Sequence, residues 1–243
     1  MNTHTHSLLT AMREKINFLL VPFLAITLLV SCKTETLFKS DFSATVDNQL
    51  PAHQQPVGTI NASGLGGSVV VVPSPVVTGG KWVKISRIAD PSTITVMQCD
   101  FNKQAGTGLY NFSAIMFIPS GNTGPASVQF ESFNQPIGTL TSFLHLDFMT
   151  DNSIRIDDRD GTNFGHYPKD SAFIVQVTIN INATAPTAHI VLAGAGASGI
   201  TDYNILSPFI GLAQSFGAVR FWMGFPWVGS FDATTILVTR RNN

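Results

Sequence analysis

The sequence predicts an all-β protein built as an antiparallel β-sandwich, and three observations lead to this fold class. Charged residues make up only 12% of the 243 residues, about half the usual share. Valine, threonine, serine, asparagine and phenylalanine are abundant, which is typical of sheets. Short segments that alternate apolar and polar residues recur between turn signals along the chain, as they do in sandwiches and barrels.

Residues 1–31 are set apart as an export signal. Charged residues 13–15 precede an apolar segment, 16–30, and such a segment followed by small residues at a cleavage point directs secretion. The segment ends in LVSC, residues 29–32, which resembles the lipobox of bacterial lipoproteins. The resemblance implies that residues 1–31 are removed and that Cys32 becomes an acylated first residue, carrying a palmitate-type lipid. An ordinary signal peptide that contains a cysteine is the alternative.

The mature chain is predicted to be an outer membrane lipoprotein on the periplasmic or cell-surface side. Lys33 follows the cysteine, where an aspartate would favour inner-membrane retention in many Gram-negative bacteria. Residues 32–36 are expected to form the lipidated cysteine and a short polar tether, and residues 37–243 a single domain. Met12 directly precedes the charged residues, so a signal that starts there would have the usual proportions.

Charge and cysteine content exclude some classes. Without residues 1–31 the chain has 12 basic and 14 acidic residues, and it lacks the concentrated basic surface of nucleic-acid-binding proteins. Once Cys32 is lipidated, Cys99 has no partner for a disulfide. Because Cys99 lies in a strand-like segment with no histidine beside it, we expect a buried, inert thiol.

The expected strands follow one another in short, regularly spaced segments. Turn signals such as PSGN at 119–122 and Asp160-Gly161 separate them. One short helix is expected within residues 208–214. The strands are expected at residues 37–42, 68–72, 81–87, 94–101, 109–118, 127–133, 140–149, 153–157, 172–182, 187–192, 217–225 and 233–239.

Two of these segments show a clear period of two. In residues 172–182 and 140–149 one face is apolar and the other is largely polar, so each strand has a core face and a second, amphipathic face. The same alternation groups Phe143, His145 and Asp147, and it groups Arg220 with Trp222. The expected core residues are Phe112, Phe130, Leu144, Leu146, Val175, Val177, Ile179, Phe221 and Ile236.

The opening LFKSDF at 37–42, the many strands and the closing TILVT at 235–239 resemble concanavalin A-like jelly rolls. This group includes lectin, glucanase and laminin-G sandwiches, in which the first and last strands often pair. The resemblance implies a jelly-roll fold over about residues 36–241, with a convex and a concave sheet. It also implies that sugar ligands lie along the concave sheet, for which the polar faces above are the candidates.

A sugar site needs a flat aromatic side chain and fixed polar groups, and the sequence supplies both. Trp222 beside Arg220 is the predicted centre, although core packing of Trp222 is the alternative. Trp227, in a turn, could add a contact at the rim, whereas Trp82 is expected to be structural. The predicted ligand-binding residues are Glu131, His145, Asp147, Gln176, Arg220, Trp222 and Trp227.

Three function classes remain open: a non-enzymatic glycan-binding module, which we favour, a polysaccharide-cleaving enzyme, and a structural lipoprotein without a small ligand. A glycosidase needs two carboxylates at a set separation, and the Glu-x-Asp-x-(x)-Glu strand of the related glucanases is missing from this sequence. The Gln-Ile-His or Gln-Val-His strand of the alginate lyases is missing too. We therefore predict no catalytic residues.

Two loops invite cofactor hypotheses. DDRDG at 157–161 contains a fragment of a calcium loop, but Asp-Gly between strands is also a common hairpin turn. We favour the hairpin and predict no cofactor, with a structural calcium as the alternative. GAGASG at 194–199 has neither a lysine nor a following helix pattern, so it is expected to be a loop between strands rather than a phosphate site.

Overall fold

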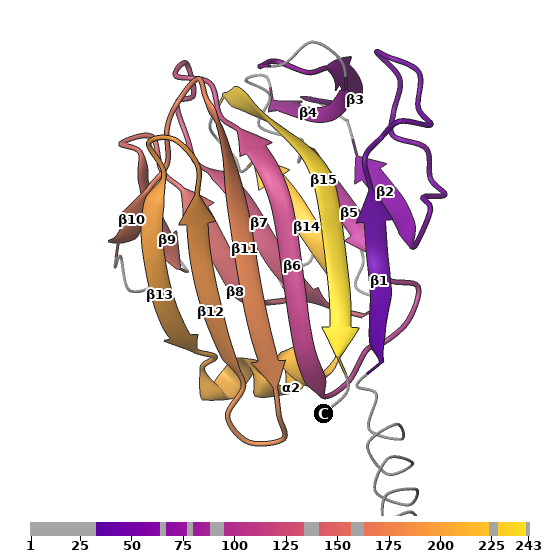
Figure 1. Ribbon diagram of the computed structural model, residues 1–243, viewed down its shortest axis with the longest axis vertical. Coiled ribbons are helices and arrows are strands. Elements are labelled where there is room, and N and C mark those ends of the chain that lie inside the picture. Colours follow the sequence, from indigo (N-terminus) through magenta and orange to yellow (C-terminus); the bar gives the residue numbers. More distant parts are fainter. Residues whose placement is uncertain are drawn as a thin grey trace, which may run out of the picture. The chain divides into compact units, whose positions relative to one another are not determined.

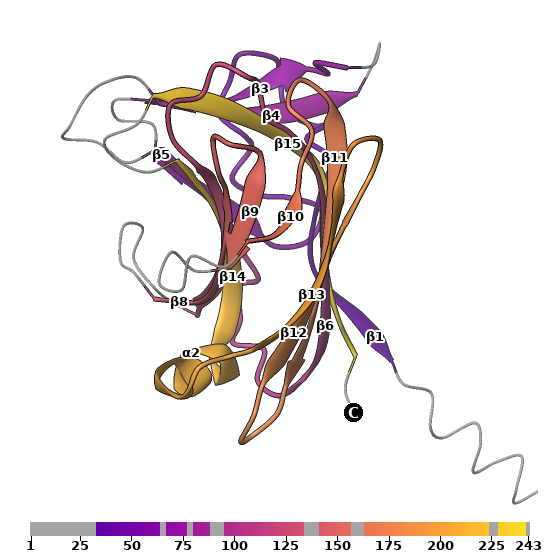
Figure 2. The ribbon, with the colours of Figure 1, turned by 90° about the vertical axis from the view of Figure 1, so that its left-hand side faces the viewer.

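Two antiparallel β-sheets lie face to face across an apolar core (Figures 1 and 2). The computed structural model describes residues 33–63, 67–76, 80–87, 95–133, 141–156, 163–223 and 228–241. All of these except Lys33 belong to one compact unit, Thr34–Asn243. The all-β jelly-roll sandwich predicted from the sequence is therefore confirmed.

Sheet A has eight strands in the order β13-β12-β11-β6-β15-β4-β3, with β1 paired to β15. Their bounds are β1 (Thr34–Ser40), β3 (Gly67–Pro73), β4 (Lys81–Arg87), β6 (Gly108–Phe117), β11 (Ala172–Ile181), β12 (Thr187–Ala193), β13 (Ser198–Asn204) and β15 (Gly229–Arg241). The pairing of β1 with β15 is the pairing of first and last strands that the resemblance implied.

Sheet B has seven strands in the order β2-β5-β14-β7-β8-β9-β10, and the β10–β13 pair joins it to sheet A. Its strands are β2 (Thr59–Ser63), β5 (Thr95–Asp100), β7 (Ala126–Ser132), β8 (Ser142–Phe148), β9 (Ser153–Ile156), β10 (Asn163–His166) and β14 (Phe216–Met223). A 3-10 turn, η1 (Ser207–Phe209), and one helical turn, α2 (Ile210–Gln214), follow β13, within the segment where the sequence predicted a short helix.

The core between the sheets consists of the apolar side chains that stand at alternating positions along the strands. All nine residues predicted for the core belong to the buried apolar cluster. In β11 the buried and less buried residues alternate over the whole strand, as the period of two predicted. Cys99 is buried in the same cluster as a free thiol, and burial raises its pKa well above the usual range.

Phe143 departs from the predicted alternation. It was expected to share a face with His145 and Asp147, but its ring makes an edge contact with Phe216, at a centroid distance of 5.1 Å, inside the core. The β7–β8 register shifts between Phe130 and Glu131, so β8 contains an irregularity there. A β-bulge places two successive residues on nearly the same side of a strand, and Phe143 is buried together with its neighbour Leu144 for this reason.

The chain also forms strands that the alternation did not predict. β2 lies within a turn-rich passage, β10 is only four residues long, and β13 begins at Ser198, inside the glycine-rich segment. Residues 194–197 of that segment do form a turn between strands. Thr34 pairs with Arg241, so residues 34–36 of the expected tether belong to β1, because backbone pairing with β15 extends to the end of that strand.

Several predicted features lie outside the described residues. These are the export signal with its lipobox and Cys32, the loop at 157–161 apart from its flanking strands, and Trp227. Within the described ranges, no helix has the length and apolar character needed to cross a membrane.

Candidate functional site

The outward face of sheet B carries three lateral rows of mostly polar residues. The strand register fixes these rows, because residues paired across neighbouring strands point to the same side of a sheet. One row runs through Thr59, Asp100, Ala218 and Glu131; the next through Asn61, Gln98, Arg220, Gln129 and His145; the third through Ser63, Val96, Trp222, Ser127, Asp147 and Arg155. We call these rows together the polar face of sheet B.

An arginine lies at the centre of this face. Nε and Nη2 of Arg220 donate to Oε1 of Gln98 at 3.3 and 2.9 Å, and Nη1 lies 3.4 Å from Oε1 of Glu131. Arg220 is 3% exposed and Glu131 is 0% exposed. A charge removed from water to this extent requires a partner, so the ion pair and the amide together hold the guanidinium in one place.

Two carboxyl groups of the polar face have raised pKa values. Burial raises the pKa of Glu131, and the Arg220 guanidinium, the Thr141 hydroxyl and His145 lower it in part. Burial also raises the pKa of Asp100, and hydrogen bonds from Gln98 and Asn61 partly offset this effect. Apart from the ion pair with Arg220, Oε1 of Glu131 has no hydrogen-bond partner among the described residues.

Beside the arginine, a histidine and an aspartate meet a tryptophan. Nε2 of His145 lies 3.0 Å from Oδ1 of Asp147 and 3.1 Å from Nε2 of Gln129, and Ser127 donates its hydroxyl to Asp147. The rings of His145 and Trp222 lie 6.1 Å apart between centroids, tilted by 48°. Trp222 is only partly buried and is not a member of the core cluster, so its indole is available on this face.

Five of the predicted ligand-binding residues therefore lie on one face: Glu131, His145, Asp147, Arg220 and Trp222. Gln176 does not join them. It lies on β11 of sheet A, opposite Ser113 and Val191, and it is exposed on the outward face of that sheet. Alternation correctly predicted that Gln176 points away from the core, but it does not determine in which sheet a strand lies.

The structure adds residues that the sequence analysis did not select, namely Asn61, Gln98, Asp100, Ser127 and Gln129. A signal for some of them was available, because Gln98 and Asp100 alternate with Met97 and Cys99 just as polar and apolar residues alternate in β11. The neighbours of β5 could not be read from that pattern, since β5 pairs with the distant strand β14.

The polar face does not have the donor set of a metal site. No group of three or more histidine, cysteine, aspartate or glutamate residues that could hold a metal ion occurs in the part of the chain that the structure describes. The carboxylates here are instead occupied by an arginine, amides and hydroxyls.

No family model matches the sequence, and no curated protein matches it. Solved structures match most of the chain. Lectin UEA-II in complex with galactose has a TM-score of 0.52 at 12% identity, covering 87% of this chain and 99% of the lectin. Basic winged bean lectin with Tn-antigen has a TM-score of 0.52 at 8% identity, covering 86% of this chain and 98% of that one. The fold is a concanavalin A-like jelly roll.

The same fold is found in an enzyme. The catalytic domain of a GH131 β-glucanase from Podospora anserina matches with a TM-score of 0.53 at 9% identity, covering 84% of this chain and 95% of that domain. These likenesses establish the jelly-roll architecture of the present chain. Its chemistry depends on its own residues, foremost those of the polar face of sheet B.

Proposed function

We propose that the protein is a glycan-binding module whose ligand lies across the polar face of sheet B. The observation that carries this proposal is the partly buried indole of Trp222 beside His145, on a face whose polar groups are held by one another. Sugars present an apolar ring face and several hydroxyls, so they bind where an aromatic ring and fixed hydrogen-bonding groups converge. Fixed groups also lose little conformational freedom on binding.

The test removes the indole. Stacking a sugar ring on Trp222 should contribute about 1–2 kcal/mol, so Trp222→Ala should weaken binding of the best oligosaccharide from a glycan array about tenfold. Gln176→Ala is the matched control, because Gln176 is exposed on the other sheet, and it should leave affinity unchanged. Equal affinity for both variants and the wild type would contradict the proposal, as would an array on which no glycan binds.

Hydrolysis is a second candidate function, favoured by one observation. Asp100 and Glu131 lie in the same lateral row, separated only by Ala218 on β14, so their Cα atoms are about 10 Å apart. Both carboxyl groups have raised pKa values, and a glycosidase uses a pair of carboxyl groups of which one is held protonated. The side chain that separates them, that of Ala218, is small and is itself buried.

This candidate is distinguished from pure binding by product formation. A hydrolase should release reducing ends from the glycan that the array identifies, and Glu131→Gln should abolish this release while binding persists. A lyase would instead release an unsaturated uronate, which absorbs in the ultraviolet. Binding without either product would leave the glycan-binding module as the function.

We also propose that Cys32 is lipidated and that the domain is held at the outer membrane. The support is the LVSC segment after an apolar stretch. Cys32→Ala should then prevent both acylation and cleavage, so that no mature form appears in the outer-membrane fraction. A variant that still matures and sediments with outer membranes would show that the anchor is wrongly assigned.

A further inference from the structure

Along one side of β15, in sheet A, the pairing with neighbouring strands is interrupted. We call this gap the notch. β15 pairs with β4 up to Ala233, opposite Val83, and with β1 from Ile236, opposite Ser40. Thr234 and Thr235 lie between these two ladders, beyond the last β4 pair and before the first β1 pair. Along the same stretch the pairing of β15 with β6 shifts register, so β15 bulges at the notch.

A cavity of about 470 Å³ occupies this place. Its volume lies in the lower half of the range of small-molecule sites, about 300–1,000 Å³. Ile115 and Thr234 belong to the outward phase of β6 and β15, so the cavity opens on sheet A, away from the polar face of sheet B. The lining residues are Asp41, Ser43, Ser74, Gly80, Lys81, Trp82, Ile115, Thr234 and Thr235.

Two residues with a strained backbone conformation adjoin the same cavity. Among the described residues six other than glycine have a positive φ, and two of them adjoin it: Thr235 at 51° lines it, and Phe42 at 58° stands between the lining residues Asp41 and Ser43. A β-branched or bulky residue rarely adopts this conformation, and such strain persists where surrounding structure enforces it, often at binding sites. The hydroxyl of Thr234, which donates to the carbonyl of Lys81 at 2.7 Å, braces the bulge.

The walls combine one carboxylate, several hydroxyls and an indole. Asp41 accepts hydrogen bonds from the backbone N–H and the hydroxyl of Ser43 at 3.0 and 2.7 Å, and these bonds lower its pKa. Trp82 is 6% exposed but lies outside the core cluster, because it belongs to the outward phase of β4. Its indole and Ile115 form the apolar part of the lining.

The charges at the cavity limit the class of ligand. The ammonium of Lys81 donates to the carbonyl of Thr45 and lies 3.4 Å from Oδ1 of Asp47, so its charge is already compensated. Lys39 also acts on Asp41, so the charges around the cavity balance and leave no excess of positive charge to attract anions such as phosphates and uronates. A single carboxylate is also too few oxygen ligands for a tightly held calcium ion. A neutral molecule with many hydroxyl donors and one apolar side fits these walls.

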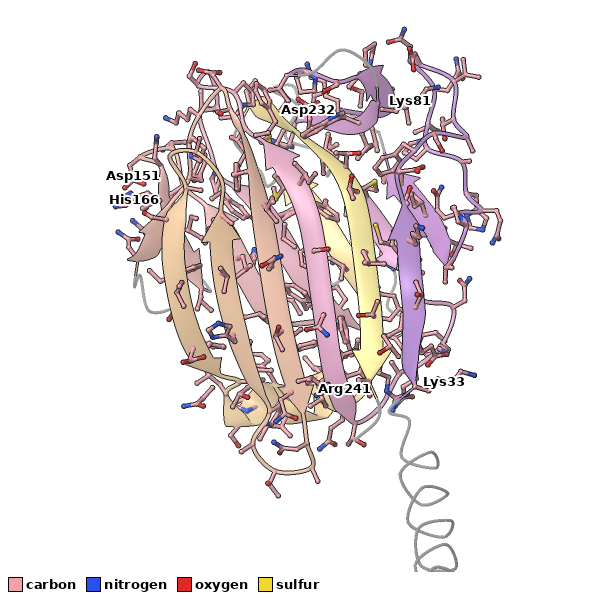
Figure 3. The ribbon with its side chains drawn as sticks, viewed as in Figure 1. Lys33, Lys81, Asp151, His166, Asp232 and Arg241 are labelled. Atoms are coloured by element: carbon pink, nitrogen blue, oxygen red, sulfur yellow. The ribbon has the colours of Figure 1, made fainter. Side chains whose placement is uncertain are left out.

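We propose that this cavity is a second binding site, for a neutral mono- or disaccharide, with Asp41 accepting sugar hydroxyls and Trp82 with Ile115 covering the apolar side. The site goes beyond the proposed function because it is on the other sheet and uses neither Trp222 nor Arg220. Figure 3 marks its position by Lys81, near β3 and β4.

The chain offers a matched control for Asp41. Asp151 forms the same Asp-x-Ser arrangement, accepting bonds from the N–H and hydroxyl of Ser153, with the same lowering of its pKa. Figure 3 shows Asp151 at the opposite edge of the molecule from Lys81. Asp151→Ala therefore removes the same charge and the same hydrogen bonds as Asp41→Ala, but away from the cavity.

The experiment is a titration of the full domain with methyl glucoside, methyl galactoside, methyl mannoside, N-acetylglucosamine, maltose and lactose, followed by calorimetry and by the indole N–H signal of Trp82 in NMR. At least one sugar should saturate the wild type and Asp151→Ala with similar affinity. Asp41→Ala should bind it at least tenfold more weakly. Asp41→Asn can still accept the hydrogen bonds from Ser43 and so keeps the turn. It should also bind the sugar more weakly, which distinguishes loss of the carboxylate from a folding defect.

Two results would overturn the inference. In the first, no sugar both saturates the wild type and shifts the Trp82 signal. In the second, Asp41→Ala and Asp151→Ala bind the sugar with equal affinity. Failure of the proposed function gives a different result. In that case Trp222→Ala leaves oligosaccharide binding intact, whatever happens at Asp41.

Discussion

Asp232 on β15 is a buried acid whose charged form the fold does not stabilise well. It is 5% exposed, it is paired in the ladder with Lys84 and Phe117, and its Oδ1 has no hydrogen-bond partner among the described residues. Burial raises its pKa to about 6, with a smaller opposing effect of Lys84. Figure 3 shows where it lies in sheet A. Asp232→Asn should therefore stabilise the protein.

The size of the effect follows from linkage. The folded state binds the Asp232 proton more tightly than the unfolded chain, whose pKa is near 3.8. The unfavourable contribution is absent below about pH 4, grows as the pH rises to about 6, and is complete above that. A shift of about two pH units corresponds to about 3 kcal/mol. The pKa of about 6 already includes the attraction to Lys84. The buried amide of asparagine also costs some desolvation free energy, so we expect a gain of about 1–3 kcal/mol at pH 8.

Urea denaturation at pH 8, 6 and 4.5 measures this dependence. The gain in the free energy of unfolding should be largest at pH 8 and should shrink steadily toward pH 4.5. Asp151→Asn is the control, because the pKa of Asp151 is lowered by Ser153, so its carboxylate stabilises the fold above its unfolded pKa and its loss should weaken the protein slightly at pH 8. If Asp232→Asn destabilises the protein at pH 8, or if its gain does not change with pH, the reasoning is refuted.

Two further predictions concern stability. Thr235→Asn should raise the free energy of unfolding by about 1 kcal/mol, because asparagine tolerates the positive φ of 51° better than a β-branched residue, and a lower melting temperature would contradict this. Arg220→Met leaves the Glu131 carboxylate buried without its cation, so it should cost about 3–5 kcal/mol at pH 8. That loss should diminish in acid, as Glu131 takes up a proton, and a pH-independent loss in denaturant titrations would count against the ion pair.

The sequence predicted those parts of the fold that depend on local alternation. In β11 and β14 every side chain predicted to face the core does so, including Val177 and Phe221, because a period of two is a property of the strand itself. The indole of Trp222 lies on the outward face for the same reason. The strands β2 and β10 are short and follow turn residues in the sequence, so no alternating pattern marked them.

Which residues come together on the polar face of sheet B could not be predicted from the alternation of apolar and polar residues alone. Gln176 and His145 have the same local pattern but belong to different sheets, and Phe143 is turned into the core by a bulge. The pairing of β5 with β14 joins residues more than a hundred positions apart, and only this pairing brings Gln98 to Arg220. Long-range register is decided by packing and loop closure, which leave little trace in a short segment.

The pairing of β1 with β15 has a consequence for the order of folding. Among the described strands, β15 is the only one that β1 pairs with, so a strand made first waits for the strand made last. Closing a loop of about 200 residues opposes this step by about 5 kcal/mol in chain entropy, and contacts so distant in sequence form slowly. Sheet A is thus completed only after β15 has been synthesised, so β1 stays without its strand partner while the intervening strands are made.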